Sequence, residues 1–346
     1  MWINSFNNFR AIAIVFIVAA HSYGISGVQR TDFFDYFISN IIAGGTSLFV
    51  FISGYLFYEV FYKNFDYISF LKKKANNVLL PYLFLGIVPI SVYLVFIQGE
   101  FNGYFDATQP GLIHEYLIPS IKYYVSGRFL PAYWYIPFIL ITFVLSPLHV
   151  RYANLSLRLQ IITIFSLCTV AVLVHRPVEN VNVFQSLFYF SPVYLIGITT
   201  AINKEYVYSS LKGKDGFLLA IVVGLAGLQA SLGLYGNFHK PAFVYSGVDI
   251  VFIQKIFMCF FFMIFLHRFE NYSNKLLCTL ASTSFSVFFI HPYIIQAWPK
   301  LGLGSIGQGS WLVFLFTVVM ICSMSVVLAK TAKLIFKRHS RMVVGY

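Results

Sequence analysis

Ten long apolar runs, separated by short polar segments, are the feature that most constrains how this chain can fold. A helix needs about 20 mostly apolar residues to cross a bilayer, and each run approaches that length. Only 10% of the residues are charged, whereas a soluble domain carries roughly 25%. The sequence therefore predicts an all-α polytopic membrane protein, formed as a single domain over residues 1–346.

The predicted spans are not equally well defined, because the fourth is short and the seventh is rich in glycine. The longest connection between them, residues 98–132, contains several Gly and Pro residues that interrupt helices. We place the ten spans at 8–27, 37–60, 78–97, 133–150, 158–175, 184–202, 216–234, 248–267, 276–296 and 311–335.

Basic residues are distributed unevenly between the loops on the two sides of the membrane. If the N-terminus lies in the cytoplasm, 17 of the 24 Lys and Arg residues fall at cytoplasmic positions and six in outer loops. Cytoplasmic loops of membrane proteins are enriched in Lys and Arg. We therefore expect both termini in the cytoplasm, which requires an even number of spans. The same distribution accounts for the net charge of +12, so we expect no nucleic-acid partner.

Arg10 and His21 lie in the first predicted span with ten apolar or small residues between them. Eleven helical steps make close to three turns, so both side chains face the same way, about 16 Å apart along the axis. An ionisable residue inside a span is costly and is typical of a functional site. Arg10 is either an anchor that reaches the headgroups or an anion-binding residue at the inner edge. His21 is either a general base or a structural buried histidine.

A second histidine, His291, precedes Pro292 in the outer part of the ninth span. Pro292 frees a backbone carbonyl that needs a partner, so His291 either bonds the backbone or takes part in the chemistry. Ser53 and Gly54 in the second span are small residues of the kind that let membrane helices approach closely.

Lys255 is the remaining charged residue inside a span, and it must face the protein interior. Three interpretations are open for its partner. Lys255 pairs with Asp249, it pairs with Glu59, or it lines the same cavity as His21.

Two further motifs each have a structural and a functional interpretation. Lys72, Lys73 and Lys74 precede the third span. They are either positive-inside anchors or a cluster that pairs with phosphates. Trp134 and Tyr135 open the fourth span at the predicted outer interface. They belong to an aromatic belt or provide a stacking platform for sugar rings.

Taken together, these motifs resemble the acyltransferase-3 family of integral membrane O-acyltransferases, including members that acetylate bacterial surface polysaccharides. The resemblance spans essentially the whole chain, and its most specific parts are the Arg10 and His21 spacing and the Ser53-Gly54 motif. The chain departs from the family where three lysines replace the usual arginines, because lysine lacks the bidentate guanidinium fork.

The resemblance implies that an acyl group, most often acetyl, moves from cytoplasmic acyl-CoA to a hydroxyl of a cell-surface polysaccharide or its lipid-linked precursor. It implies acyl-CoA, chiefly acetyl-CoA, as the donor substrate and no permanently bound cofactor. It also implies a multi-pass protein of the bacterial inner membrane, with a polysaccharide synthesis or export complex as a candidate partner.

The same resemblance assigns roles to the residues above. Phosphates of CoA are held by Arg10, Lys72, Lys73 and Lys74. The base, or the transient carrier of the acyl group, is His21, assisted by Arg10 and by His291. The residues expected to contact the acceptor or to stabilise the reacting group are Trp134, Tyr135, Ser53 and Lys255.

A transporter or flippase that moves a glycan or an acyl group without chemistry is the alternative function. Charges within the membrane and ten helices suit it too, but the sequence shows no internal repeat of the kind common in transporters. The four cysteines lie in apolar runs without metal-ligand spacing, so we expect no metal site.

Overall fold

The structure is a computed structural model that describes residues 4–97, 99, 103–272, 274–307 and 309–346. Within these residues it is all-helical, apart from one isolated bridge between Arg176 and His239. The elements, in chain order, are α1 (Asn4–Ala20), α2 (Tyr23–Ser26), α3 (Phe33–Ile42), α4 (Gly45–Leu56), η1 (Phe57–Phe61), η2 (Tyr62–Asn64), α5 (Tyr67–Lys74), η3 (Ala75–Leu79), α6 (Leu80–Phe96), η5 (Ile113–Leu117), α7 (Ile118–Ser126), α8 (Tyr135–Val144), α9 (Ser146–Ala153), α10 (Leu157–Val174), η6 (Val178–Asn180), α11 (Val183–Ile202), α12 (Lys204–Leu211), α13 (Asp215–Ser231), α14 (Ile250–His267), α15 (Lys275–Lys300), α16 (Trp311–Phe336), η7 (Lys337–His339) and α17 (Ser340–Val344).

Seven helices of the described chain are long and apolar enough to cross a membrane. The number rises to eight if α8 and α9, which meet at a bend of 59°, form one broken span. The prediction of a polytopic all-α protein is confirmed, with seven or eight candidate spans by length and composition where the sequence suggests about ten. The difference lies in α1 and α13, which are apolar but only 17 residues long. At 1.5 Å per residue each covers about 25 Å, less than the roughly 30 Å hydrocarbon core.

The first helix ends earlier than the predicted span 8–27. The backbone N–H groups of His21 and Ser22 bond to the carbonyls of Val18 and Ala19, three residues back, and the Ser22 hydroxyl also donates to Val18 O at 2.8 Å. Because these backbone bonds span three residues instead of four, the α-helix ends at Ala20. His21 therefore lies at the C-terminal end of α1, not within it.

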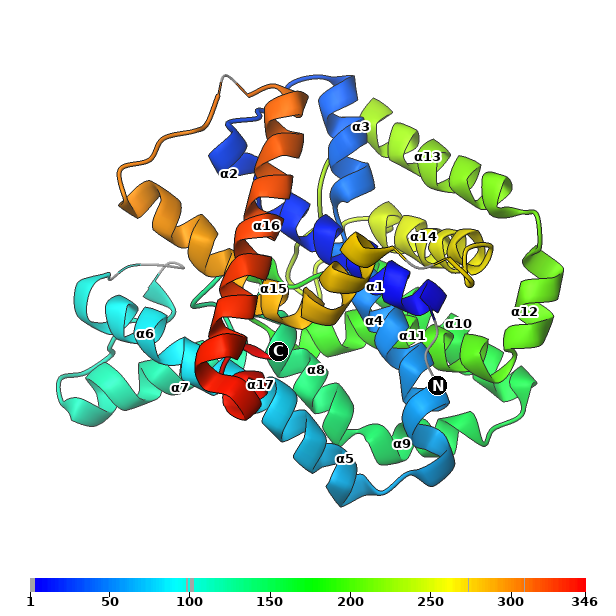
Figure 1. Cartoon of the computed structure of the whole chain (residues 1–346), viewed down its shortest axis with the longest axis horizontal. Coiled ribbons are helices and arrows are strands. Elements are labelled where there is room, and N and C mark those ends of the chain that lie inside the picture. Colours follow the sequence, from blue (N-terminus) through cyan, green and yellow to red (C-terminus); the bar gives the residue numbers. More distant parts are fainter. Residues whose placement is uncertain (1–3, 98, 100–102, 273, 308) are drawn as a thin grey trace.

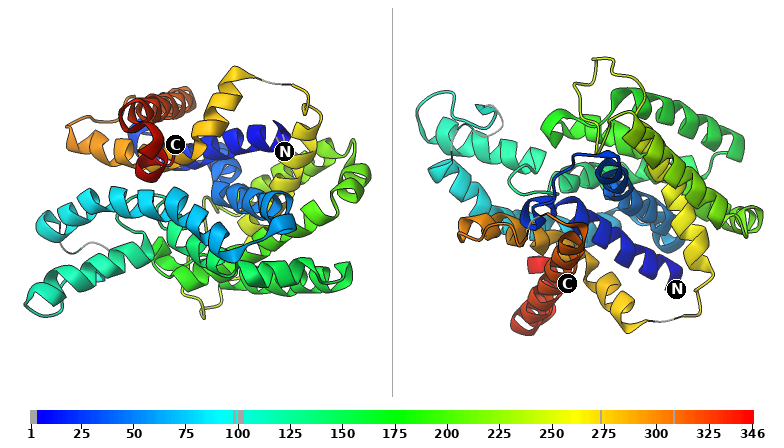
Figure 2. Two further views of the ribbon diagram at one scale, coloured as in Figure 1. Left: turned by 60° about the horizontal axis from the view of Figure 1, so that its bottom comes forward. Right: turned by 90° about the horizontal axis from the view of Figure 1, so that it is seen from above.

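The helix α1 is the centre of the bundle, packed against α4, α14 and α15. Figure 1 shows it in dark blue, with α4 below it and α15 and α16 crossing beside it. By contrast, α6 and α7 extend to one side of the molecule in the views of Figure 1 and Figure 2. The central position of α1 places both Arg10 and His21 among neighbouring helices.

The helices α4 and α11 approach each other closely at two glycines. A Cβ atom added at Gly54 would lie 2.0 Å from Tyr194 O, and one added at Gly197 would lie 2.3 Å from Phe51 O. The two backbones therefore touch, as small residues allow in membrane helices. The packing interpretation of Gly54 is confirmed.

The loops gather at two ends of the bundle. At the first end lie the basic segments, joined by contacts such as Asn4 to Glu270, Lys204 to Glu59, Arg268 to Asp215, and Tyr67 to Val144. The other end is joined by Arg128 to Glu179, Ile306 to Ile25, Asn40 to Leu234, and Trp311 to Asp35. Because α17 packs on η3 and α6, both chain ends lie at the basic end. That this end faces the cytoplasm stays a prediction from the charge bias.

Candidate active site

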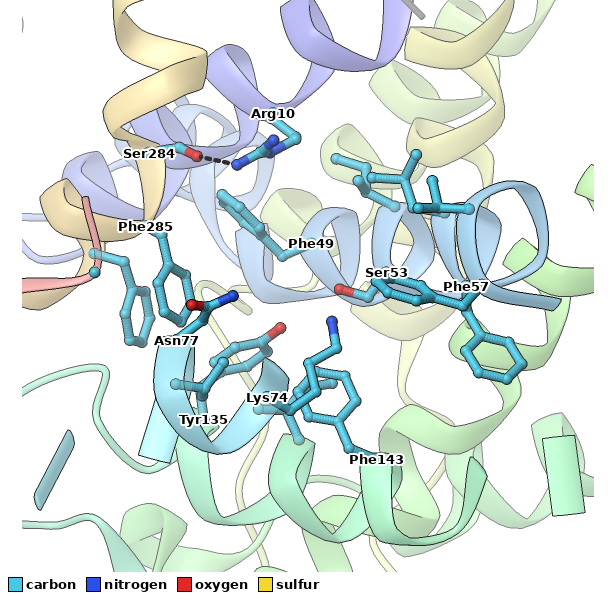
Figure 3. Close-up of a pocket in the computed structure, with 18 of the residues that line it drawn as sticks. Arg10, Phe49, Ser53, Phe57, Lys74, Asn77, Tyr135, Phe143, Ser284 and Phe285 are labelled. Carbon is cyan, nitrogen blue, oxygen red and sulfur yellow. Dashed lines mark hydrogen bonds between the residues drawn. The ribbon is translucent and has the colours of Figure 1, made fainter. Parts of the chain in front are cut away.

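A cavity of about 400 Å³ opens among α1, α4, α5, η3, α8 and α15, and we call it the inner cavity. Three basic residues line it: Arg10 from α1, Lys74 from the end of α5, and Arg341 from α17. Figure 3 shows Arg10 and Lys74 entering it from opposite sides, with apolar and aromatic side chains around them. None of the described residues that line it is acidic. The inner cavity is therefore suited to a ligand with negative charge and an apolar part.

Arg10 is held in place by a hydrogen bond from its Nη2 to the Ser284 hydroxyl, at 3.1 Å (Figure 3). Ser284 lies on α15 and is completely buried. No ion pair of Arg10 with a carboxylate occurs among the described residues. A guanidinium with one neutral partner keeps most of its donors for a ligand.

Only one of the three clustered lysines reaches the inner cavity. Lys74 lies over the rings of Phe143, Phe61 and Phe70, at 4.4, 4.9 and 5.2 Å from their centroids. Lys72 and Lys73 are exposed and do not line the cavity. Three consecutive helical residues spread over roughly 200° of the helix circumference, so one face cannot hold them all. Lys72 and Lys73 therefore lie outside the inner cavity, and their expected contact with CoA phosphates stays a prediction.

The structure separates Trp134 from Tyr135. Tyr135 and Ser53 line the inner cavity, whereas Trp134 lines a second pocket toward the opposite end. Trp134 is also only 5% exposed. It packs within the protein against Phe190 and Phe138, so it does not belong to an exposed aromatic belt. Tyr135 instead shares the inner cavity with Arg10, and the expected acceptor contacts of Trp134 and Tyr135 stay predictions.

The second pocket, which we call the outer pocket, has a volume of about 220 Å³ and includes His21. Its other polar groups include Thr46 of α4 and four residues of the connecting segments: Arg176, Asn180, Asn237 and His239. No hydrogen bond to either His21 ring nitrogen is found among the described residues. The imidazole is therefore open to a bound reactant.

His291 lies beside His21, with ring centroids 5.7 Å apart. Its Nδ1–H donates to Val287 O at 2.8 Å, because a carbonyl can only accept. That bond leaves Nε2 without a proton, and this nitrogen is buried with no hydrogen-bond partner among the described residues. His291 thus bonds the backbone, as one interpretation expects, and still has an acceptor close to His21.

Two side chains, Ile17 and Phe288, line both the inner cavity and the outer pocket. They form an apolar partition between the basic inner cavity and the pocket that holds His21. Arg10 lies within α1, and His21 directly follows the last residue of that helix. The two residues lie on opposite sides of this partition.

Lys255 belongs to neither site. Its Nζ donates to Asn40 O at 2.9 Å and to Ile41 O at 2.8 Å. These are among the last carbonyls of α3, which have no partner within the helix. A cation there donates to them and interacts favourably with the negative end of the helix dipole. Glu59 pairs with Lys204 instead, at 3.0 Å. The expected pairing with Asp249 or Glu59 and the expected place beside His21 are all wrong.

Sequence reasoning missed the loop residues of the outer pocket and Arg341. Arg176 entered the sequence argument only as one of six basic residues in outer loops. The one signal in the sequence is that outer loops contain few basic residues. The spatial pairing of Arg176 with His239, 63 positions later, has no sequence signal.

Comparison with known proteins adds the family. No curated protein and no solved structure matches the chain. A family model described as an acyltransferase domain does match, over residues 3–330, which is nearly the full length. The protein with this basic inner cavity and this outer histidine pocket therefore belongs to the acyltransferase-3 family of membrane acyltransferases.

Proposed function

We propose that the protein is an O-acyltransferase that moves an acetyl group from cytoplasmic acetyl-CoA to a hydroxyl of a cell-surface polysaccharide or its lipid-linked precursor. The observation that carries the proposal is the pair of abutting cavities, one basic and one containing His21, with Ile17 and Phe288 between them. We place the protein in the inner membrane of a bacterium, where both substrates are at hand.

The inner cavity takes the donor. Arg10, Lys74 and Arg341 hold the CoA phosphates, for which cationic donors are the usual partners. The aromatic and aliphatic lining contacts the pantetheine arm, which carries the thioester toward the partition. The acyl end then passes between Ile17 and Phe288 to reach His21.

In the outer pocket His21 acts as the general base. It takes the proton from the acceptor hydroxyl while the hydroxyl oxygen forms a bond to the thioester carbonyl carbon. The carbon–sulfur bond then breaks, and the CoA thiolate takes the proton from the His21 imidazolium. His291 acts as a positioning residue whose free Nε2 accepts a hydrogen bond in this site, directly or through one water.

The test is mass spectrometry of the host surface polysaccharide from three strains: wild type, gene deletion, and His21→Ala. We expect the wild-type glycan to be heavier by one acetyl group per modified residue. The deletion strain and His21→Ala should both lack that mass, while the variant protein still accumulates in the membrane. A general base raises the reaction rate roughly 10²- to 10⁴-fold, so its loss should remove the acetylation signal.

Two results would overturn the proposal. Normal acetylation in the His21→Ala strain would remove His21 from the chemistry. An export defect without any mass difference between wild type and deletion would instead favour a transporter without chemistry.

A further inference from the structure

The outer pocket contains a cation, Arg176, that forms no ion pair with a carboxylate among the described residues. Arg176 is only 4% exposed, and its Nε is buried without a hydrogen-bond partner among the described residues. Glu179 pairs with Arg128 at 3.1 Å, and Asp249 accepts hydrogen bonds from the Tyr189 hydroxyl and the Phe252 N–H. Neither carboxylate forms an ion pair with Arg176. Asp249 acts on Arg176 electrostatically but at a distance, so the guanidinium keeps donors for a bound ligand.

Arg176 is fixed in this position by its surroundings. Its guanidinium lies over the Trp134 ring, 4.6 Å from the centroid, and 5.6 Å from that of Phe190. Its backbone N–H donates to Phe238 O, and its carbonyl accepts from the Lys240 N–H at 3.0 Å. The aromatic rings offset part of the free-energy cost of burying the guanidinium. They contact its flat face, so the N–H donors in its plane stay available. The cation is therefore preorganised.

Three hydrogen-bond acceptors line the same pocket as Arg176. Asn180 and Asn237 both line the outer pocket, and the Oδ1 atom of each is buried without a partner among the described residues. His239 donates its Nδ1–H to Pro177 O at 2.7 Å, which leaves its Nε2 as an acceptor. Burial, and next the charge of Arg176, lower the pKa of His239 to about 4, so the ring stays neutral. Three acceptors beside one cation suit a ligand with several hydroxyls and one negative group.

We propose that the outer pocket binds an acceptor sugar that carries an oxyanion, with Arg176 pairing with that oxyanion and Asn180, Asn237 and His239 accepting from its hydroxyls. The oxyanion is a carboxylate of an acidic sugar or a phosphate ester, both of which match the guanidinium fork. A pocket of about 220 Å³ holds a single sugar unit. The inference rests on the proposed function, in which this pocket faces the acceptor.

Saturation-transfer NMR on the purified protein in nanodiscs tests it with three probes. These are methyl β-D-glucuronide for the carboxylate, α-D-glucose 1-phosphate for the phosphate, and methyl β-D-glucoside as the neutral control. We expect at least one charged probe to bind roughly tenfold or more tightly than the neutral glucoside, as for a charge-assisted contact. The probe that shows the preference identifies the source of the oxyanion.

Arg176→Gln should remove the preference, and Arg176→Lys should retain a reduced one. Arg30→Gln is the matched control, because Arg30 also lies over aromatic rings, Tyr23 at 4.7 Å and Tyr235 at 4.9 Å, but outside the pocket. Binding of CoA to each variant checks that the protein is folded. The wild-type comparison stands even if Arg176→Gln fails to fold.

Equal binding of all three probes, or binding of none, would overturn the inference, as would a preference that survives in Arg176→Gln. Acetylation of a neutral glycan without any charged-probe preference would contradict this inference alone. A charged-probe preference without acyl transfer would contradict the enzymatic proposal instead.

Discussion

At the scale of single residues, Lys74 and Lys73 offer a matched pair on one helix. Lys74 lines the inner cavity and Lys73 is exposed, so they differ in access to the donor but not in charge. A charge-assisted hydrogen bond contributes roughly 1.5–3 kcal/mol. We therefore expect Lys74→Ala to weaken CoA binding roughly tenfold or more, and Lys73→Ala to change it less than about twofold. Isothermal titration of CoA into the protein in nanodiscs measures both, and equal effects would contradict the assignment.

The residues of the site were predictable to different degrees. Helix geometry alone predicts a common face for Arg10 and His21, but α1 ends at Ala20, so the regular helix does not reach His21. The helix geometry also shows why one lysine of three reaches the cavity, but not which one. Lys255 was misassigned because its partners are the backbone carbonyls of Asn40 and Ile41, which have no sequence signature.

At the scale of helices, the contact of α4 with α11 depends on Gly54. A methyl group there would meet Tyr194 O at 2.0 Å, closer than real Cβ atoms approach, so one backbone must move. Overpacking of this kind costs typically 1–3 kcal/mol and sometimes more. We expect Gly54→Ala to lower the thermal midpoint of the detergent-solubilised protein by several degrees.

The control for that substitution is Gly224→Ala on α13. Nothing lies within 4 Å of a Cβ atom at Gly224, and alanine favours a helix by about 1 kcal/mol over glycine. Its midpoint should stay the same or rise slightly. A Gly54→Ala variant as stable as the wild type would show that the two helices are not in backbone contact.

Helix positions were largely predictable, and helix ends were not. Every predicted span overlaps a helix, because the apolar runs are long and well separated. The end of α1 at Ala20 depends on the Ser22 hydroxyl bonding back to Val18, a local contact that hydropathy does not register. The short α17 lies beyond the family match at residues 3–330, yet it supplies Arg341 to the inner cavity.

At the scale of the whole molecule, the two cavities depend on contacts between distant parts of the chain. The inner cavity joins residues of α1 with those of α15 and α17, and the outer pocket joins α1 with loops near Arg176 and His239. The sequence predicts which end of the bundle each loop occupies, because basic residues mark one end. It does not predict which loops meet, since that depends on how the helices pack.

Transfer of the acetyl group across the membrane through His21 is measured with host membrane vesicles of both orientations. The vesicles contain their own glycan acceptor, and [¹⁴C]acetyl-CoA is added from outside. Inside-out vesicles, which expose the cytoplasmic face, should incorporate label into the enclosed glycan, and right-side-out vesicles should not. The label should disappear in His21→Ala and persist in Lys73→Ala. Incorporation in right-side-out vesicles, or undiminished incorporation in His21→Ala, would contradict the account.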